Sequence, residues 1–538
     1  MNIRIRRCVA CLALLPCTAW SGDGPVTARP LPTSIVQILD KPLYRNAVWG
    51  MKVVDLDTGE VIYDKNPGQL FLIGSVRKLF SVGVLLDALG ADYRFRTPVH
   101  RRGAVDAAGE LRGDLILTAS GDLAMGGRTR PDGNFALSDL DHNEANALGS
   151  ALLAGADPLA GYDALARQVA AAGIKRVSGE VMIDDRLFVP FNFRGEFDVR
   201  PIFVNDDVVD IVMRPTSADA PASVDWRPKS AALAVRSTLR TTAAGTGAAP
   251  DLVPELPACI GLVGCEGQVG GTLALGFVPP FTGTLPLVRT FRIVQPSNYA
   301  RTVFIEALER AGVAVAAPAV APNPAASLPP RNAFANEAPV AELVSHPYRD
   351  AARFILKVSY NIGADLSTML YGISRGVATF PAALAAELRQ LATAFDVPPD
   401  ELHFIDGSGG GETRASNDAV VRLLRAMSRR PAFGDFHDAL PSLGVDGSLA
   451  MVTRFADDPA LAGARGQVHA KTGTYVVGTE TGAALKAQAL AGYVLAKSGR
   501  RLAFTLAVND VGAISDISDV VEVAQDQGTI AAYLWQLP

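Results

Sequence analysis

Residues 73–89 read Ile-Gly-Ser-Val-Arg-Lys-Leu-Phe-Ser-Val-Gly-Val-Leu-Leu-Asp-Ala-Leu, a polar start followed by an apolar run. The pattern predicts a buried helix from Ser75 to Leu89 that ends at Gly90. Because Ser75 and Lys78 are three residues apart, the hydroxyl and the amine lie on one face of the helix. The helix N-terminus also stabilises negative charge that develops on the serine oxygen. Ser75 is therefore a candidate nucleophile, and Lys78 is a candidate general base.

Two further motifs supply what this helix lacks, namely Ser359-Tyr-Asn361 and Lys471-Thr472-Gly473-Thr474. Ser-x-x-Lys, Ser-x-Asn and Lys-Thr-Gly each occur once in the chain. The similar Lys497-Ser-Gly499 lies in a predicted hairpin turn, so we expect Lys497 to face solvent. Ser359 and Asn361 offer a proton relay and amide hydrogen bonds, and Lys471 offers a cation for an anionic substrate. Lys78 and Lys471 could instead be ordinary surface lysines, and Asn361 a helix cap. That interpretation does not explain why the three motifs occur once each and in this order.

The flanking sequence predicts a sheet built from both ends of the chain. A hairpin is expected at residues 48–64, with strands at 487–495 and 501–508 and a closing helix at about 517–537. These strands can join in one antiparallel sheet flanked by helices. Residues 30–95 and 332–538 form the predicted catalytic domain.

Residues 96–204 and 291–331 form a predicted inserted α+β domain, because residues 163–182 and 300–316 each run helix, Ala-Gly, β-branched strand. Residues 205–290, rich in Val, Thr, Gly and Pro, form a predicted nested all-β domain. We expect residues 126–160, with their Gly, Asn and Asp, to be a solvated loop. Within this loop, residues 139–143 resemble a calcium loop only faintly, because the required Gly and distal Glu are missing.

The first 21 residues are predicted to be a signal peptide, with a basic start, an apolar stretch shorter than a membrane span and small residues at the end. We therefore expect a periplasmic protein without a stable membrane span after processing. Removal of Arg4, Arg6 and Arg7 would change the net charge from −5 to −8. This acidic balance and the lack of a basic run argue against a nucleic-acid partner.

Processing would also leave Cys259 and Cys265 as the remaining cysteines. In an exported chain, such a pair favours one local disulfide, and two buried thiols are the alternative. The pair alone cannot fill a tetrahedral metal site, so no metal is expected.

The three motifs resemble those of serine β-lactamases and penicillin-binding proteins. Ser359 lies 284 positions after Ser75, and Lys471 lies a further 112 positions along. This spacing is similar to that of the D-alanyl-D-alanine carboxypeptidase/endopeptidase family, the class C low-molecular-mass penicillin-binding proteins, in which extra domains interrupt the catalytic domain. The Gly-rich segments 406–409 and 440–447 also resemble this family. Ile73-Gly74 departs from its usual Pro-Ala.

The resemblance implies an α/β (α+β) fold: a serine β-lactamase/penicillin-binding transpeptidase-like catalytic domain with large inserted α+β and all-β domains. It implies a serine D-Ala-D-Ala carboxypeptidase or D,D-endopeptidase that acts on peptidoglycan peptides through an acyl-enzyme. It also implies β-lactam antibiotics as covalent inhibitors and no cofactor. The implied catalytic residues are Ser75, Lys78, Ser359 and Asn361, and the implied substrate-binding residues are Lys471, Thr472, Gly473 and Thr474. We expect burial and Lys471 to lower the pKa of Lys78.

Two alternatives remain open. A β-lactamase or esterase could use the same motifs, but no carboxylate in the sequence stands out to activate a deacylating water. A non-catalytic protein that binds cell-wall peptides would need no lysine base. Residues 372–376 match Gly-x-Ser-x-Gly, but they follow a predicted helix, whereas a nucleophile elbow follows a strand. His469, two residues before Lys471, is expected to be packed or solvent-facing rather than in the cleft.

Overall fold

The structure is a computed structural model that describes residues 28–480, 482–515 and 517–538. The predicted signal peptide at residues 1–21 lies outside these residues. No helix within the described ranges is both long enough and apolar enough to cross a membrane.

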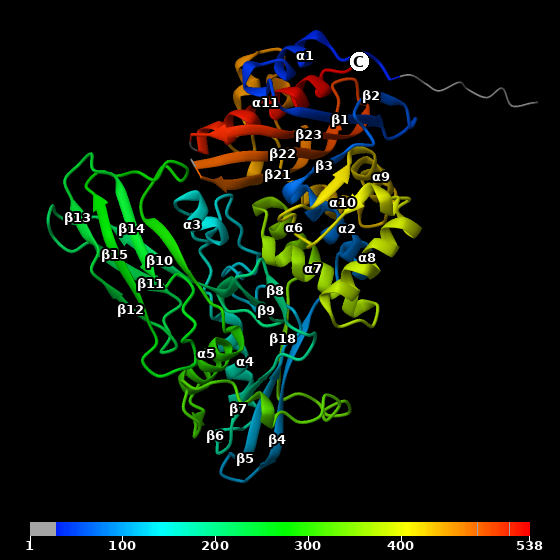
Figure 1. Cartoon of the computed structure of the whole chain (residues 1–538). Helices are drawn as coiled ribbons and strands as arrows, with labels where there is room; N and C mark the ends of the chain where they lie inside the picture. Colours follow the sequence, from blue (N-terminus) through cyan, green and yellow to red (C-terminus); the bar gives the residue numbers. More distant parts are fainter. Residues whose placement is uncertain (1–27, 481, 516) are drawn as a thin grey trace, which may run out of the picture.

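A five-stranded antiparallel sheet joins the two ends of the chain in the order β2-β1-β23-β22-β21. Its strands are β1 (Val48–Asp55), β2 (Val61–Lys65), β21 (Val468–Thr479), β22 (Gly482–Leu495) and β23 (Arg501–Ile514). In Figure 1, the blue N-terminal strands lie beside the red C-terminal strand, and Met51 pairs with Leu506. The predicted hairpin and C-terminal strands are thus present, and β21 lies at one edge of the sheet.

Side chains alternate between the two faces of this sheet, and each face packs on a different core. Leu490 of β22 packs with α1 (Thr33–Leu39) and α11 (Ile517–Trp535). Its neighbours Ala489 and Ala491 belong instead to a core shared with the remaining helices of this part. These helices are α2 (Lys78–Leu89), α6 (Tyr348–Val358), α7 (Asn361–Ser374), α8 (Phe380–Ala394), α9 (Asn417–Met427) and α10 (Phe433–Asp438). The small strands β3 (Leu70–Leu72), β19 (Leu402–His403) and β20 (Arg414–Ser416) form a second sheet beside them.

The part inserted between α2 and α6 contains a mixed sheet in the order β17-β6-β5-β4-β18, with β7 paired to β5. Its strands are β4 (Arg96–Val105), β5 (Glu110–Thr118), β6 (Arg176–Val177), β7 (Val181–Asp184), β17 (Ala314–Val315) and β18 (Ala341–Val344). Two helices, α4 (Ala160–Ala171) and α5 (Pro296–Arg310), contact each other. The two similar sequence units contain β6 and β17, which pair in parallel.

Strands without helices form the next part of the insertion, at the left of Figure 1. Two sheets, β11-β10-β16 and β12-β15-β13 with β14 on β15, contain these strands. The strands are β10 (Val208–Arg214), β11 (Ser223–Arg227), β12 (Ala234–Ser237), β13 (Arg240–Thr242), β14 (Ala248–Val253), β15 (Glu266–Ala274) and β16 (Leu287–Arg292). Their buried side chains share one core with those of α4 and α5. A short hairpin, β8 (Phe191–Phe193) and β9 (Phe197–Val199), leads towards the part that contains the five-stranded sheet.

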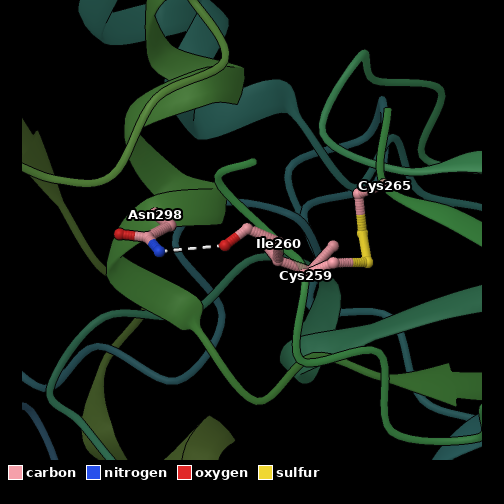
Figure 2. Close-up of a disulfide and its surroundings, with 4 residues drawn as sticks. All are labelled: Cys259, Ile260, Cys265 and Asn298. Atoms are coloured by element: carbon pink, nitrogen blue, oxygen red, sulfur yellow. Dashed lines mark hydrogen bonds between the residues drawn. A yellow bond between two sulfur atoms is a disulfide. The ribbon is translucent and has the colours of Figure 1, made fainter. Parts of the chain in front are cut away.

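A disulfide joins Cys259 and Cys265 in the loop between β14 and β15 (Figure 2). The carbonyl oxygen of Ile260, inside this loop, accepts a 2.9 Å hydrogen bond from Asn298 of α5. The closed loop is thus tied to the helix of the inserted α+β part.

The segment 126–160 is not the solvated loop that its composition indicated. It contains α3 (Ala145–Leu148), and Arg128, Asp141 and His142 are each 5% exposed or less. Their charges meet partners from residues 206–210, which no local stretch of sequence could reveal. The expectation of a solvated loop is therefore wrong, because distant carboxylates make burial of these polar groups possible.

Candidate active site

Ser75 and Lys78 lie where the chain turns from β3 into α2. Ser75 belongs to a single 3₁₀ turn (Gly74–Arg77), and Lys78 begins the α-helix, so the predicted helix starts in a tighter form. The Nζ atom of Lys78 is 2.6 Å from Ser75 Oγ, 2.7 Å from Asn361 Oδ1 and 2.9 Å from the Ser408 carbonyl oxygen. The first and second predicted motifs therefore meet at one amine.

Glycines allow β21 to pass directly over this turn. A Cβ atom on Gly473 would lie 2.1 Å from the carbonyl oxygen of Ile73, and one on Gly74 would lie 2.7 Å from the Thr474 nitrogen. Gly74 also has a left-handed φ of +48°. The Gly of Lys-Thr-Gly and the Gly before Ser75 are thus required by backbone contact, which brings the third motif to Ser75.

Arg77 fixes the turn that carries Ser75 through buried hydrogen bonds. This fully buried guanidinium donates to both carboxylate oxygens of Glu387 on α8, at 2.7 and 2.8 Å. Its Nε donates to the carbonyl oxygen of Asp406, in the first Gly-rich segment. Asp406 in turn accepts backbone N–H bonds from residues 408–410 and shapes that turn.

The Ser-x-Asn motif lies at a junction between two helices. Ser359 caps the C-terminus of α6 with a left-handed φ of +67°, and Asn361 begins α7. The left-handed backbone of Ser359 thus separates the two helices. Ser359 is half-buried, and among the described residues its hydroxyl forms no hydrogen bond. Residues 372–376 end α7, so the Gly-x-Ser-x-Gly match is a helix-ending turn.

Lys471 lies on β21 and is fully buried, as is Lys78. Its Nζ donates to the Thr472 carbonyl oxygen at 2.8 Å. The Thr472 hydroxyl is 2.8 Å from that of Ser448, and the Thr474 side chain, which is exposed, donates to Gln488. His469, on the same strand, packs against the ring of His437 and is half-buried.

Burial lowers the pKa values of both lysines. The pKa of Lys78 falls to about 7, mainly through burial and then through Arg194. The pKa of Lys471 falls well below its usual value, through burial and then through Lys78. We expected Lys471 to be the cation that lowers the pKa of Lys78. The cation with the largest effect on this pKa is instead Arg194 of the inserted part.

Two side chains that the sequence analysis missed reach this site from the insertion. Glu144, from segment 126–160, accepts a 3.2 Å hydrogen bond from Asn361 Nδ2. Arg194, after β8, donates to the Ser408 hydroxyl at 3.0 Å. Both residues line a cavity of about 260 Å³ that also touches Asn361. No local motif marks either residue, since each matters only through contacts made across the fold.

One group of described residues has donor atoms close enough to hold a metal ion: Asp141, His142 and Asp206. The guanidinium of Arg128 already lies among them and hydrogen-bonds both carboxylates. The imidazole contacts Asp206 and Asp210 through its two nitrogens, each at 2.8 Å. Arg128, Asp141, His142, Asp206 and Asp210 therefore form a buried ionic cluster in which protein cations occupy the place of a metal.

Known proteins resemble this chain over most of its length. The sequence pattern of the D-Ala-D-Ala carboxypeptidase 3 (S13) family matches residues 31–256 and 265–527. A D-alanyl-D-alanine carboxypeptidase of Actinomadura sp. (strain R39) is 27% identical over 530 residues, covering 93% of this chain and 85% of that protein. Carboxypeptidase DacB of Mycolicibacterium smegmatis is 32% identical over 184 residues, 32% of this chain and 36% of that protein.

Among solved structures, penicillin binding protein 4 (dacB) from Haemophilus influenzae has the same fold. Its TM-score is 0.66 at 16% sequence identity, with 94% of this chain and 99% of that chain covered. The fold and the motifs define a serine-type peptidase of the penicillin-binding class. The chain belongs to the D-Ala-D-Ala carboxypeptidase 3 (S13) family, and its function is that of a serine carboxypeptidase.

Proposed function

We propose that Ser75 is the nucleophile that attacks the carbonyl carbon of the penultimate D-Ala in a peptidoglycan stem peptide. The observation that carries this proposal is the 2.6 Å contact between Ser75 Oγ and the buried amine of Lys78. A buried amine with a pKa of about 7 can be neutral at the working pH and can accept the serine proton.

The hydrogen bonds around Lys78 suit this role. A neutral amine has two N–H donors and one lone pair, and Asn361 Oδ1 and the Ser408 carbonyl oxygen can accept the two donors. The lone pair then faces the Ser75 hydroxyl. As the Ser75 Oγ–carbon bond forms, the hydroxyl proton passes to Lys78. When the bond to the terminal D-Ala breaks, that proton passes through Ser359 to the leaving amine.

Water then releases the acyl group, so the enzyme returns with Ser75 free. The backbone N–H groups of Ser75 and Thr474 are proposed to stabilise the oxyanion in both steps. Loss of one such donor typically costs about 3 kcal/mol at the transition state. The close approach of Gly473 to the nucleophile turn supports this pairing of the two N–H groups.

The terminal carboxylate of the substrate is proposed to bind at Thr472, Gly473 and Thr474, with Lys471 behind them. Thr474 is exposed, whereas Lys471 is fully buried. An arriving carboxylate would supply the counter-charge that Lys471 lacks and would raise the pKa of this lysine. The substrate thus favours charge on Lys471 and leaves Lys78 free to act as the base.

β-Lactam antibiotics are proposed to acylate the same serine, because a strained lactam with a carboxylate resembles the D-Ala-D-Ala amide. The test is mass spectrometry of the intact protein, and then of its peptides, after exposure to a fluorescent penicillin. We expect one label per chain on the peptide that contains Ser75, and none for Ser75→Ala. A label elsewhere, or no label on folded protein, would contradict the assignment.

The protein is proposed to act in the periplasm after loss of residues 1–21. The disulfide between Cys259 and Cys265 supports an oxidising compartment. N-terminal sequencing and a thiol count on denatured, unreduced protein test this proposal. An intact start or two free thiols at these positions would count against it.

A further inference from the structure

We propose that Glu144 is a positioning residue through which the inserted part of the chain controls the catalytic amine. Its carboxylate holds the Asn361 side chain in the orientation that presents Oδ1 to Lys78. The inference rests on the proposed roles of Ser75 and Lys78 and adds a residue that lies outside all three motifs.

The contacts form a continuous chain of hydrogen bonds. Glu144 Oε1 accepts from Asn361 Nδ2 at 3.2 Å, and Asn361 Oδ1 accepts from Lys78 Nζ at 2.7 Å. A carboxylate can only accept from an amide nitrogen, so Glu144 excludes the flipped amide. In the flipped form, Nδ2 would point at the lysine and would compete with Ser75 for its lone pair.

The buried ionic cluster explains why Glu144 can hold this position. Asp141 accepts two hydrogen bonds from Arg128, and both nitrogens of His142 contact carboxylates. Glu144 follows directly in the same turn, and its backbone N–H donates to the Asp141 carbonyl oxygen. The turn that carries Glu144 is therefore fixed by ion pairs buried within the inserted part.

Glu144 also sets the electrostatic balance of the site. The cations that act on it are Lys78, Arg292, Arg194 and Lys471. Burial nevertheless raises the pKa of Glu144 above its usual value. In its ionised form, Glu144 opposes the lowering of the pKa of Lys78 that burial causes. The groups that face Lys78 are Arg194, Asp406, Asp365, Glu144 and Lys471. Glu144 is the one among them that the segment 126–160 supplies.

Two substitutions separate the hydrogen bond from the charge. Glu144→Ala removes both, whereas Glu144→Gln removes the charge and keeps an acceptor for Asn361, although its amide can also donate and excludes the flipped form less strictly. The measurement is the rate of penicillin acylation at Ser75 from pH 5 to pH 9, with folding checked by thermal unfolding. Penicillin G carries no cation, so loss of an ion pair between Glu144 and the substrate cannot explain a slower rate. The matched control is Glu196→Gln, an exposed acid that lines the same cavity.

We expect Glu144→Ala to slow acylation about tenfold at pH 8 and Glu144→Gln to slow it about threefold or less. Because the negative charge raises the pKa of Lys78, Glu144→Gln should also move the acidic limb of the pH profile to lower pH. Asp365, whose pKa is raised to about 7 by burial and then by Asp406, should titrate as before, since Glu144 is not among the causes of its shift. The control should leave both rate and profile unchanged.

A double-mutant cycle tests whether Glu144 acts through Asn361. Glu144→Ala should have little further effect once Asn361 is replaced by Ala. Unchanged acylation and an unmoved acidic limb in both Glu144 variants would overturn the inference, as would an effect confined to cationic peptide substrates. If Ser75 itself is not labelled in the wild type, the proposed function fails instead, so the two failures are distinguishable.

Discussion

Two buried groups of charges lie close together in this molecule, and burial has opposite outcomes in them. In the active site, the cations Lys78 and Lys471 are fully buried, and burial lowers both pKa values. In the buried ionic cluster, burial also acts to lower the pKa of His142. There, the carboxylates of Asp210, Asp141 and Asp206 outweigh it and raise that pKa to about 10.

The difference lies in the number of carboxylates within contact of each cation. Among the described residues, Lys78 has hydrogen bonds only to neutral oxygens, those of Ser75, Asn361 and Ser408. His142 contacts carboxylate oxygens through both ring nitrogens, and these charges favour the protonated imidazole although Arg128 also lies 3.1 Å from Nε2. Burial alone therefore does not make a cationic side chain neutral. The fold must also keep carboxylates out of hydrogen-bond contact with the amine.

The largest expected effect comes from removal of the base. Lys78→Ala should slow acylation of Ser75 by penicillin by about 10²- to 10⁴-fold, the usual contribution of a general base. Stopped-flow or gel-based labelling with fluorescent penicillin measures the rate. Lys497→Ala, in the turn before β23, should acylate at the wild-type rate. Similar rates for the two variants would remove Lys78 from the mechanism.

Removal of the Arg128 guanidinium tests the buried ionic cluster, where carboxylates compensate the buried cations. Arg128→Ala leaves the carboxylates of Asp141 and Asp206 partly uncompensated inside the protein. We expect the free energy of unfolding to fall by about 3–5 kcal/mol, as when one partner of a buried ion pair is removed. Urea unfolding followed by circular dichroism gives the value. Arg176→Ala, which removes an exposed arginine from β6, should change it by about 0.5 kcal/mol or less.

The sign of the pH dependence distinguishes the two regions further. Because the pKa of His142 in the folded state is raised, its stabilising contribution is fully present below pH about 6.5 and is lost as the pH rises through about 10. Between these values, the stability of the wild type should fall by up to about 1.4 kcal/mol per pH unit. His142→Gln should show a flatter dependence. Equal slopes for the two proteins would mean that His142 is neutral in the folded state.

Lys471 should have the smallest effect, and one that depends on the substrate. Lys471→Ala removes the charge behind the carboxylate site, and a charged hydrogen bond of this kind contributes about 1.5–3 kcal/mol. This corresponds to a loss of about tenfold to a hundredfold in kcat/KM for a peptide that ends in free D-Ala. An amidated analogue lacks the carboxylate and should lose much less. Equal losses for both substrates would place the carboxylate elsewhere.

Much of this arrangement could be predicted from sequence because its signals are local. The apolar run after Ser75 indicated α2, and strand-like segments at both ends of the chain indicated the sheet. These patterns depend on residues a few positions apart. The family spacing then predicted an interrupted catalytic part.

The rest could not be predicted because it depends on contacts between distant segments. Glu144 lies 217 positions before Asn361 in the sequence, and no pattern links the two. Arg128 and Asp141 lie in a segment whose composition is typical of a solvated loop. Their burial depends on Asp206, which lies far along the chain. The left-handed conformation of Ser359 could not be predicted either, because a single such residue leaves no trace in the periodicity.

The pH dependence of Ser75 acylation in the wild type reports the pKa of the Lys78 amine in the free enzyme. We expect Lys78 to be a neutral base because its hydrogen-bond partners among the described residues are neutral oxygens, not carboxylates. We predict that the rate of penicillin acylation rises with pH and reaches half its maximum near pH 7. A rate that still rises through pH 9 towards the ordinary lysine pKa, about 10.4, would show that Lys78 stays charged and would contradict the account.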